Sequence, residues 1–318
     1  MDRKKTDMET GRKQVVCYGE VLWDVLPSGR KPGGAPMNVA YHLRRLGIPS
    51  VLVSRIGDDT DGRALLDFLS GMGIAIDFVQ VDEQYETSRV MATIGRDNEV
   101  SYQILEPVAW DFIQYDPRLS TLIHTSDVLV YGSLAARSTQ SHATLQQLLD
   151  HAKYRLFDVN LRPPHYTPEL IDGLFRRADA AKLNSHELAQ VSNWLDIGRG
   201  SEDERVGRLQ ERYELGEIIV TKGAQGASYY TPGTRRDFPA IRVSVTDTVG
   251  SGDAFLAAFL VQKLRGEGNE TLLELATALG AYVTTKTGAC PHYSRADLDH
   301  FIWENTLRKR EDKKAPHN

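Results

Sequence analysis

The sequence has few of the features that would place it outside the ordinary globular proteins. Its 318 residues include only two cysteines, Cys17 and Cys290, which lie far apart. A disulfide between them is possible, but one pair in a chain of this length is more typical of reduced thiols, so we expect a cytoplasmic protein. No apolar run approaches the roughly 20 residues of a membrane-spanning helix, and we therefore expect no membrane partner.

A strong excess of one charge is also lacking. The formal net charge is −5, with 25% charged and 41% hydrophobic residues, as in a globular protein with a sizeable core. This mild acidity gives no reason to expect nucleic acid as a partner. Residues 1–13 are charged and precede no long apolar segment, so we expect a flexible tail and not a signal peptide. We expect a second tail at 305–318 and one folded domain at 14–304.

Two common catalytic motifs are missing. No Gly-x-x-x-x-Gly-Lys-Ser/Thr segment occurs, which excludes phosphate binding by a Walker loop. His186-Glu187 could begin a zinc-protease motif, but Gln190 stands where the second histidine would have to be. No internal repeat or low-complexity tract is apparent either. Any phosphate or metal chemistry must therefore come from another arrangement.

One glycine-containing stretch, residues 247–255, offers such an arrangement. It lies between an alternating run at 241–245, which predicts a strand, and an apolar helical pattern at 254–264. The amides of a helix's first turn attract anions, and Gly250 and Gly252 allow the backbone to approach a phosphate closely. Ser251 is small enough not to block that approach. The stretch therefore predicts an anion site at a helix N-terminus.

Asp253 is unexpected in an anion site because its carboxylate repels phosphate. One interpretation is that Asp253 accepts the proton of a hydroxyl group that attacks phosphorus. The other is that it only caps or charges the start of the helix, which is common. These residues alone leave both interpretations open.

Elsewhere, short apolar strands alternate with helical patterns, which favours an α/β fold with a parallel sheet covered on both faces. Polar residues, Asp24 among them, follow several of these strands, and the carboxyl ends of parallel strands share one edge. We expect strands at 15–18, 50–56, 127–131, 156–159, 180–183 and 217–221, and helices at 35–46, 60–72, 140–153, 168–177, 186–195 and 254–264. Residues 78–81, 88–94 and 99–105 look like strands of an inserted β layer.

Several segments, taken together, resemble the ribokinase-like (PfkB-type) carbohydrate kinases. GGAPMNVA at 33–40 and DTVGSGDAF at 247–255 are similar to the two signatures of that family. The phrases GEVLWD, GSLAARS, DVNLRPPHY, KLNSHEL and TKGAQGA follow the family order, and the set is most similar to fructokinases. The resemblance implies a three-layer fold with a central, mostly parallel sheet and a small β lid formed by residues 25–32 and 78–106.

The resemblance also implies an activity. It implies transfer of a phosphoryl group from ATP to a sugar, most similar to phosphorylation of D-fructose at its 6-hydroxyl, with magnesium as one ion and potassium as an optional second ion. A homodimer that pairs through the lid is the expected assembly, since pairing would cover exposed sheet edges.

Matching positions in this sequence carry the implied roles. The catalytic set is Asp253 as general base, the amides of Gly250, Ser251 and Gly252 as anion hole, and Arg162 on the phosphoryl group. The sugar-binding set is Asp24, Gly33, Gly34, Asn38, Arg96 and Asn160. The ATP-binding set is Asn184, Thr221, Gly223, Gly226 and Gly288, while Glu187 holds magnesium through water and Asp247 borders a possible potassium site. Arg162 could instead form a surface ion pair, and Arg96 could simply decorate a turn.

Two other functions stay open. A kinase for 2-keto-3-deoxygluconate would need an extra cation for the acceptor's carboxylate, which Arg96 could supply. A sugar-sensing protein could keep the fold without turnover, but it would have no use for an intact Asp253 and Gly250-Ser251-Gly252.

Overall fold

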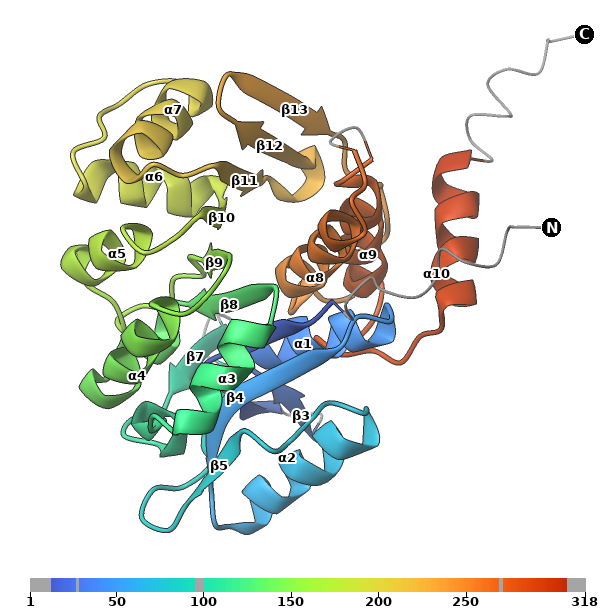
Figure 1. Cartoon of the computed structure of the whole chain (residues 1–318). Helices are drawn as coiled ribbons and strands as arrows, with labels where there is room; N and C mark the ends of the chain where they lie inside the picture. The colour runs from blue at the N-terminus through green and yellow to red at the C-terminus, as the bar shows by residue number, and fades with distance from the viewer. Residues whose placement is uncertain (1–12, 27–28, 95–99, 269–270, 308–318) are drawn as a thin grey trace, which may run out of the picture.

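The computed structural model describes residues 13–26, 29–94, 100–268 and 271–307. Within them the chain forms a large sheet, a small sheet and helices on both faces of the large one (Figure 1). The strands of the large sheet are β1 (Val15–Tyr18), β4 (Ser50–Gly57), β5 (Val79–Asp82), β8 (Val128–Gly132), β9 (Arg155–Asp158), β10 (Ala180–Asn184), β11 (Glu217–Thr221), β12 (Ala227–Thr231) and β13 (Thr234–Phe238).

The order of these strands is β13-β12-β11-β10-β9-β8-β1-β4-β5. All pairs from β11 to β5 are parallel, and the hairpin of β12 and β13 adds two antiparallel strands at one edge. The helices are α1 (Ala35–Arg45), α2 (Thr60–Gly71), α3 (Pro117–Thr125), α4 (Thr139–Leu149), α5 (Pro168–Phe175), α6 (Ser185–Trp194), α7 (Glu202–Tyr213), α8 (Ser251–Leu264), α9 (Glu274–Thr284) and α10 (Arg295–Ile302). The predicted α/β class with a mostly parallel sheet is confirmed.

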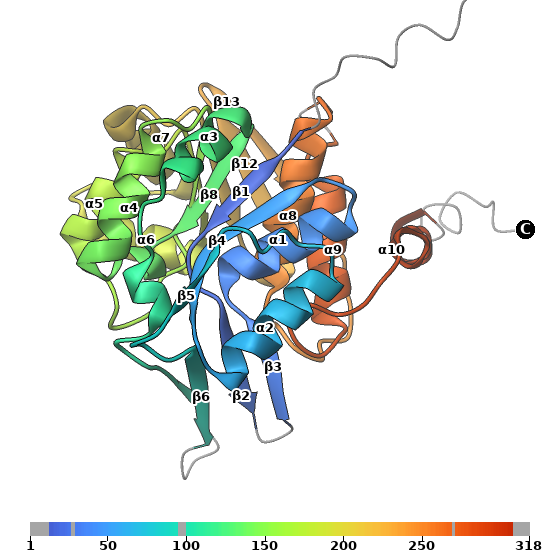
Figure 2. The same ribbon diagram turned by 60° about the horizontal axis from the view of Figure 1, so that its bottom comes forward.

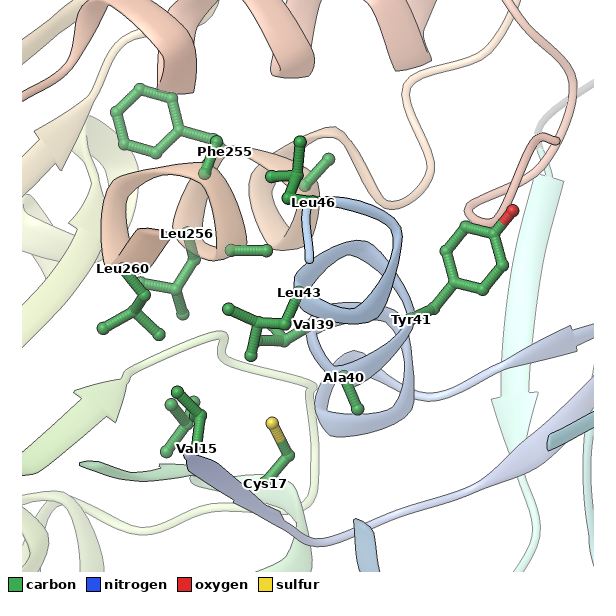
Figure 3. Packing of buried hydrophobic residues seen from close by; sticks show 14 of the residues in the cluster. Val15, Cys17, Val39, Ala40, Tyr41, Leu43, Leu46, Phe255, Leu256 and Leu260 are labelled. Atoms are coloured by element: carbon green, nitrogen blue, oxygen red, sulfur yellow. The ribbon is translucent and has the colours of Figure 1, made fainter. Parts of the chain in front are cut away.

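Alternate side chains of the central strands point into two separate hydrophobic cores, one on each face of the large sheet. Val15 and Cys17 of β1 pack with α1, α8 and α9, and Figure 3 shows both side chains below Val39 and Leu43 of α1. Val16 and Tyr18 point the other way, into the core formed with α3 to α7. This alternation is the period of a strand buried on both faces, and it gives the three layers of the fold. None of the described helices is long and apolar enough to cross a membrane.

The small sheet has the strand order β3-β2-β6-β7 and projects beyond the large sheet (Figure 2). Its strands are β2 (Leu22–Leu26), β3 (Gly29–Gly33), β6 (Ser88–Ile94) and β7 (Val100–Ile104). Asp61, near the start of α2, ties this sheet to the body, because it forms ion pairs with Arg30 of β3 and Arg89 of β6. We call the small sheet the lid.

Three local predictions were wrong. Residues 78–81 do not belong to the lid, because β5 follows α2 and returns to pair in parallel with β4, as a βαβ unit does. Asp24 does not follow a strand of the large sheet but lies inside β2. Residues 241–245 form no strand, because no described strand pairs with their backbone. Ile241, Arg242, Val243 and Val245 line a cavity instead.

Candidate active site

A cavity of about 1330 Å³ lies between the lid, the carboxyl ends of the parallel strands and the N-terminus of α8. This volume exceeds the range of a typical single-ligand pocket, so two small molecules can lie in it together. The predicted residues that line it are Asp24, Gly34, Asn38, Asn160, Arg162, Asn184, Glu187, Thr221, Gly223, Gly226, Asp247, Gly250, Ser251, Gly252, Asp253 and Gly288. Gly33 lies beside it against Asp24, and Arg96 lies outside the described residues.

The start of α8 is shaped for an anion. Gly250 is the N-cap in the left-handed conformation, with φ of 74°, and no side chain of the described residues caps this helix. A Cβ on Gly250 would lie 2.6 Å from the Cα of Ala289, so only glycine fits there. The Ser251 amide donates to the Thr248 carbonyl at 3.3 Å, whereas the amides of Gly252 and Asp253 have no partner among the described residues. These two amides are left for a ligand in the cavity, and the helix dipole favours one with negative charge.

Asp253 lies in that first turn, and its side chain is half-buried. The Nδ2 of Asn38 donates a hydrogen bond to its Oδ2 at 2.8 Å. Burial raises the pKa of Asp253, and the nearby Asp158 raises it further, whereas Lys182, Asn38 and Arg162 lower it. A carboxyl group with a raised pKa in a cavity has the chemistry of a general base.

Arg162 and Asn160 lie on the loop after β9. The Arg162 guanidinium donates to the Leu161 carbonyl at 3.1 Å, and no carboxylate of the described residues forms an ion pair with it. The alternative of a surface ion pair therefore finds no partner in the described part of the chain. Asn160 has a φ of 36°, a strained value that is concentrated at functional sites.

Asn184 and Glu187 form a capping box at the start of α6. Asn184 Oδ1 accepts from the Glu187 amide at 2.9 Å, while Glu187 accepts from the amides of Leu161 and Asn184 at 2.9 and 2.8 Å. Burial raises the pKa of Glu187. Both carboxylate oxygens keep a lone pair free, which suits a contact with metal-bound water.

Direct binding of a metal by protein side chains does not fit this site. Among the described residues, no group of three or more His, Cys, Asp and Glu side chains is placed to hold an ion. Magnesium usually keeps several waters and binds through substrate phosphates, so one carboxylate beside the phosphate position fits it. Asp247 instead links two loops, because it accepts from the amides of Val249 and Gly288 at 3.0 and 2.9 Å.

The lid supplies two opposite charges. Asp24 of β2 and Lys31 of β3 are cross-strand partners, and both line the cavity. Burial raises the pKa of Asp24 to about 6, with smaller contributions from Asp247 and Asp253 that are offset by Arg162. Neither side chain has an ion-pair partner among the described residues, so both are available to a ligand.

Sequence reasoning missed four charged or polar residues that line or border the cavity. Asp158 ends β9 and Lys182 lies within β10, each directly beside buried apolar residues of its strand, and that contrast was the available signal. Glu20 accepts from the Ala35 amide at 3.2 Å, but its Oε2 is buried without a partner among the described residues. The Sγ of Cys290 donates to Asn38 Oδ1 at 3.3 Å and so orients the amide that binds Asp253.

Glu20 is unusual among these residues because its charge state changes near neutral pH. Burial raises its pKa to about 7, and the neighbouring Asp253 contributes a smaller increase.

Comparisons with known proteins agree with this architecture. Residues 12–295 match the model of the pfkB family carbohydrate kinases. The chain is 30% identical over 306 residues to probable fructokinase-5 of Arabidopsis thaliana, which covers 87% of this chain and 93% of that protein. It is also 30% identical over 297 residues to the fructokinase of Klebsiella pneumoniae, covering 87% and 94%.

Solved structures share the fold. A fructokinase with bound ATP from Xylella fastidiosa superimposes with a TM-score of 0.83 at 22% identity, covering 92% of this chain and 99% of that one. A Vibrio cholerae fructokinase bound to fructose, ADP and a calcium ion gives 0.79 at 24% identity, with the same coverage.

Proposed function

Because the chain belongs to the pfkB family of carbohydrate kinases, and is an ATP-dependent sugar kinase, we propose that its acceptor is the 6-hydroxyl of D-fructose. The observation that carries this proposal is the position of Asp253, a half-buried carboxylate in the first turn of α8 that lines a cavity with room for two ligands. The fructokinases among its relatives support the choice of sugar.

In the proposed reaction, Asp253 accepts the proton of the acceptor hydroxyl as that oxygen attacks the γ-phosphorus and ADP leaves. The amides from Gly250 to Gly252 donate to the phosphoryl oxygens, where negative charge develops. Arg162 offsets part of that charge from the opposite loop. Magnesium would neutralise phosphate charge when bound with the nucleotide, and Glu187 with Asn184 would orient its waters.

The two ends of the cavity divide the ligands between them. We assign the sugar to Asp24, Gly33, Gly34, Asn38 and Asn160, beneath the lid. We assign the nucleotide to Thr221, Gly223, Gly226 and Gly288, with Asp247 as part of a potassium site. Closure of the lid over the sugar would exclude water, which otherwise competes as an acceptor.

The test is ADP release by purified protein with ATP and magnesium, across fructose, ribose, glucose and 2-keto-3-deoxygluconate. We expect turnover on fructose, and Asp253→Asn should lower it by about two or more powers of ten. Fructose should still raise the Tm of Asp253→Asn, since sugar binding does not need the base. Turnover of Asp253→Asn at the wild-type rate would refute the assignment of the base. Wild-type binding of fructose without turnover would instead identify a sugar sensor.

Lys31 favours a second acceptor, 2-keto-3-deoxygluconate. Its ammonium lines the cavity without an ion-pair partner among the described residues, and an acceptor carboxylate would supply one. Lys31→Met should leave KM for fructose within about twofold if fructose is the acceptor. A rise of about tenfold or more in KM for 2-keto-3-deoxygluconate, together with the higher kcat/KM on that sugar, would reverse the choice.

We also propose a cytoplasmic homodimer that pairs through the lid. The outer strands β3 and β7 leave sheet edges, and Met91 and Leu105 beside them are each 39% exposed. Light scattering tests this, and a monomer at micromolar concentration would contradict it.

A further inference from the structure

A buried ion pair lies beneath the N-terminus of α8. Asp158 ends β9, Lys182 lies in β10, and the two are partners in the parallel register. The Lys182 Nζ donates to Asp158 Oδ1 at 2.8 Å and to Oδ2 at 2.9 Å. Their side chains are only 8% and 5% exposed. Removing both charges from water is costly, and apolar residues of similar size often stabilise a core equally well, so stability alone does not explain the pair.

The pair also lies next to the proposed reaction. Lys182 lines the cavity, and its Nζ lies 3.5 Å from the position that a Cβ on Gly252 would take. The ammonium therefore lies close to the second residue of α8, beside the anion hole. Asp253 is the next residue, and the charges of Asp158 and Lys182 act on its carboxyl group in opposite directions.

We propose that Asp158 and Lys182 are positioning residues for phosphoryl transfer. Lys182 adds a fixed positive charge beside the anion hole, and Asp158 holds that charge in place while offsetting its effect on Asp253. The inference rests on the proposed function, in which Asp253 is the general base. Without Asp158, the lone ammonium would make the base too weak; without Lys182, the lone carboxylate would keep Asp253 protonated.

Other charged and polar groups face Asp253 from every element packed around it. They are Asn38 of α1, Glu20 after β1, Asp24 of β2, Arg162 after β9 and Cys290 after α9. These groups are the same in all the variants below, and so is the titration of ATP itself. Differences in pH profile between the Asp158 and Lys182 variants therefore measure the effect of the ion pair on Asp253.

The test is the pH profile of kcat/KM for the sugar from pH 5.5 to 9. In Asp158→Asn, the midpoint of the acidic limb should fall by about one pH unit. In Lys182→Met, it should rise by a similar amount. Both should lower kcat at the optimum by about tenfold or more. Shifts in the same direction, or no shift in either variant, would overturn the proposal.

The double variant Asp158→Asn/Lys182→Met keeps the test decisive if a single variant fails to fold, because it leaves no unpaired buried charge. Its midpoint should lie near that of the wild type, while kcat stays at least about tenfold lower. Wild-type kcat in the double variant would overturn the proposal.

Asp179→Asn is the matched control, since Asp179 pairs with Arg155 at the other end of the same two strands, at 2.6 Å. It should leave the profile unchanged. Asp253→Asn, measured in parallel, separates a failure of the ion-pair proposal from a failure of the general-base assignment.

Discussion

The two ends of the cavity are built differently. At one end, which we call the phosphoryl end, α8 begins above the edge of the large sheet with the half-buried Asp253 in its first turn, and Asp158 and Lys182 are buried there. At the other, the lid end, Asp24 and Lys31 sit on a small sheet and are half-buried. The phosphoryl end is packed against the hydrophobic core of the large sheet. The lid end belongs to the small sheet, which contacts the rest of the protein through the ion pairs of Asp61.

This difference separates reaction from recognition. The phosphoryl end needs fixed dipoles and charges, because transition-state stabilisation depends on donors that do not reorganise during the reaction. The lid end must admit and release a sugar, so a less buried sheet suits it. Substitutions at the phosphoryl end should therefore change kcat, and those at the lid end should mainly change KM.

The largest effect is expected at Gly250. In Gly250→Ala, the new Cβ would meet Ala289, which must displace the first turn of α8 and its amides. We expect kcat to fall by two to three powers of ten, on the scale of a lost anion-hole donor. Steady-state kinetics with saturating sugar and ATP would measure this.

Gly266→Ala is the matched control for this substitution. Gly266 follows the other end of the same helix with φ of 73°, close to the 74° of Gly250, but no atom of the described residues lies within 4 Å of its Cβ position. It should cost about 1 kcal/mol of stability with kcat unchanged. If both variants lose the same activity, backbone strain and not the contact with Ala289 is responsible.

The phosphoryl end was the more predictable from sequence. Gly250, Gly252 and Asp253 are adjacent, and a glycine turn before a helix fixes its own geometry, so the motif could be located before the fold was known. The pairing of Asp158 with Lys182 could not, because the two residues are 24 positions apart and meet only through the register of β9 and β10.

The lid was the less predictable because its strands are drawn from distant segments. β2 pairs with β6 across more than 60 residues, and nothing local marks β5 as a strand of the large sheet. Residues 241–245 also show that a local sequence pattern cannot reveal whether a partner strand is present. Their alternation is real, but period two identifies a strand only when a partner strand is present to take its hydrogen bonds.

Glu20 lies where the two ends of the cavity meet. Its substitution should have the next largest effect, a pH-dependent change in the free energy of unfolding. A pKa raised from 4.5 to about 7 means that the folded state binds a proton more tightly than the unfolded chain. The protonated Glu20 therefore adds to the free energy of unfolding. This stabilisation is fully present below pH 4.5 and is lost as the pH rises through 7, a change in the free energy of unfolding of at most about 3 kcal/mol. Glu20→Gln keeps an acceptor for the Ala35 amide without the charge, so it should be more stable than wild type at pH 8 and similar at pH 4.5.

Unfolding by urea at a series of pH values would measure this difference. The exposed Glu211→Gln on α7 is the control and should follow the wild-type curve. If the free energies of unfolding of wild type and Glu20→Gln changed with pH in the same way, Glu20 would not be the titrating group.

The smallest effect is expected at the connection between lid and body. Asp61→Asn weakens the pairs with Arg30 and Arg89, which are about half exposed, so each contributes only about 1 kcal/mol or less. The lid that carries Asp24 should then be held less closely over the sugar. We expect KM for the sugar to rise about three- to tenfold, with kcat within about twofold of wild type. Initial rates against sugar concentration would measure both.

Asp58→Asn is the control for Asp61→Asn. Asp58 lies just before the same helix and pairs with Arg63 at 2.9 Å, but both side chains are well exposed and neither belongs to the lid. Loss of the Asp58–Arg63 pair should change neither KM for the sugar nor kcat. If Asp61→Asn lowered kcat as strongly as it raised KM, the lid would take part in the chemical step, and the division between the two ends would not hold. A KM that rose alone would show that recognition can vary on this fold while the phosphoryl end stays fixed.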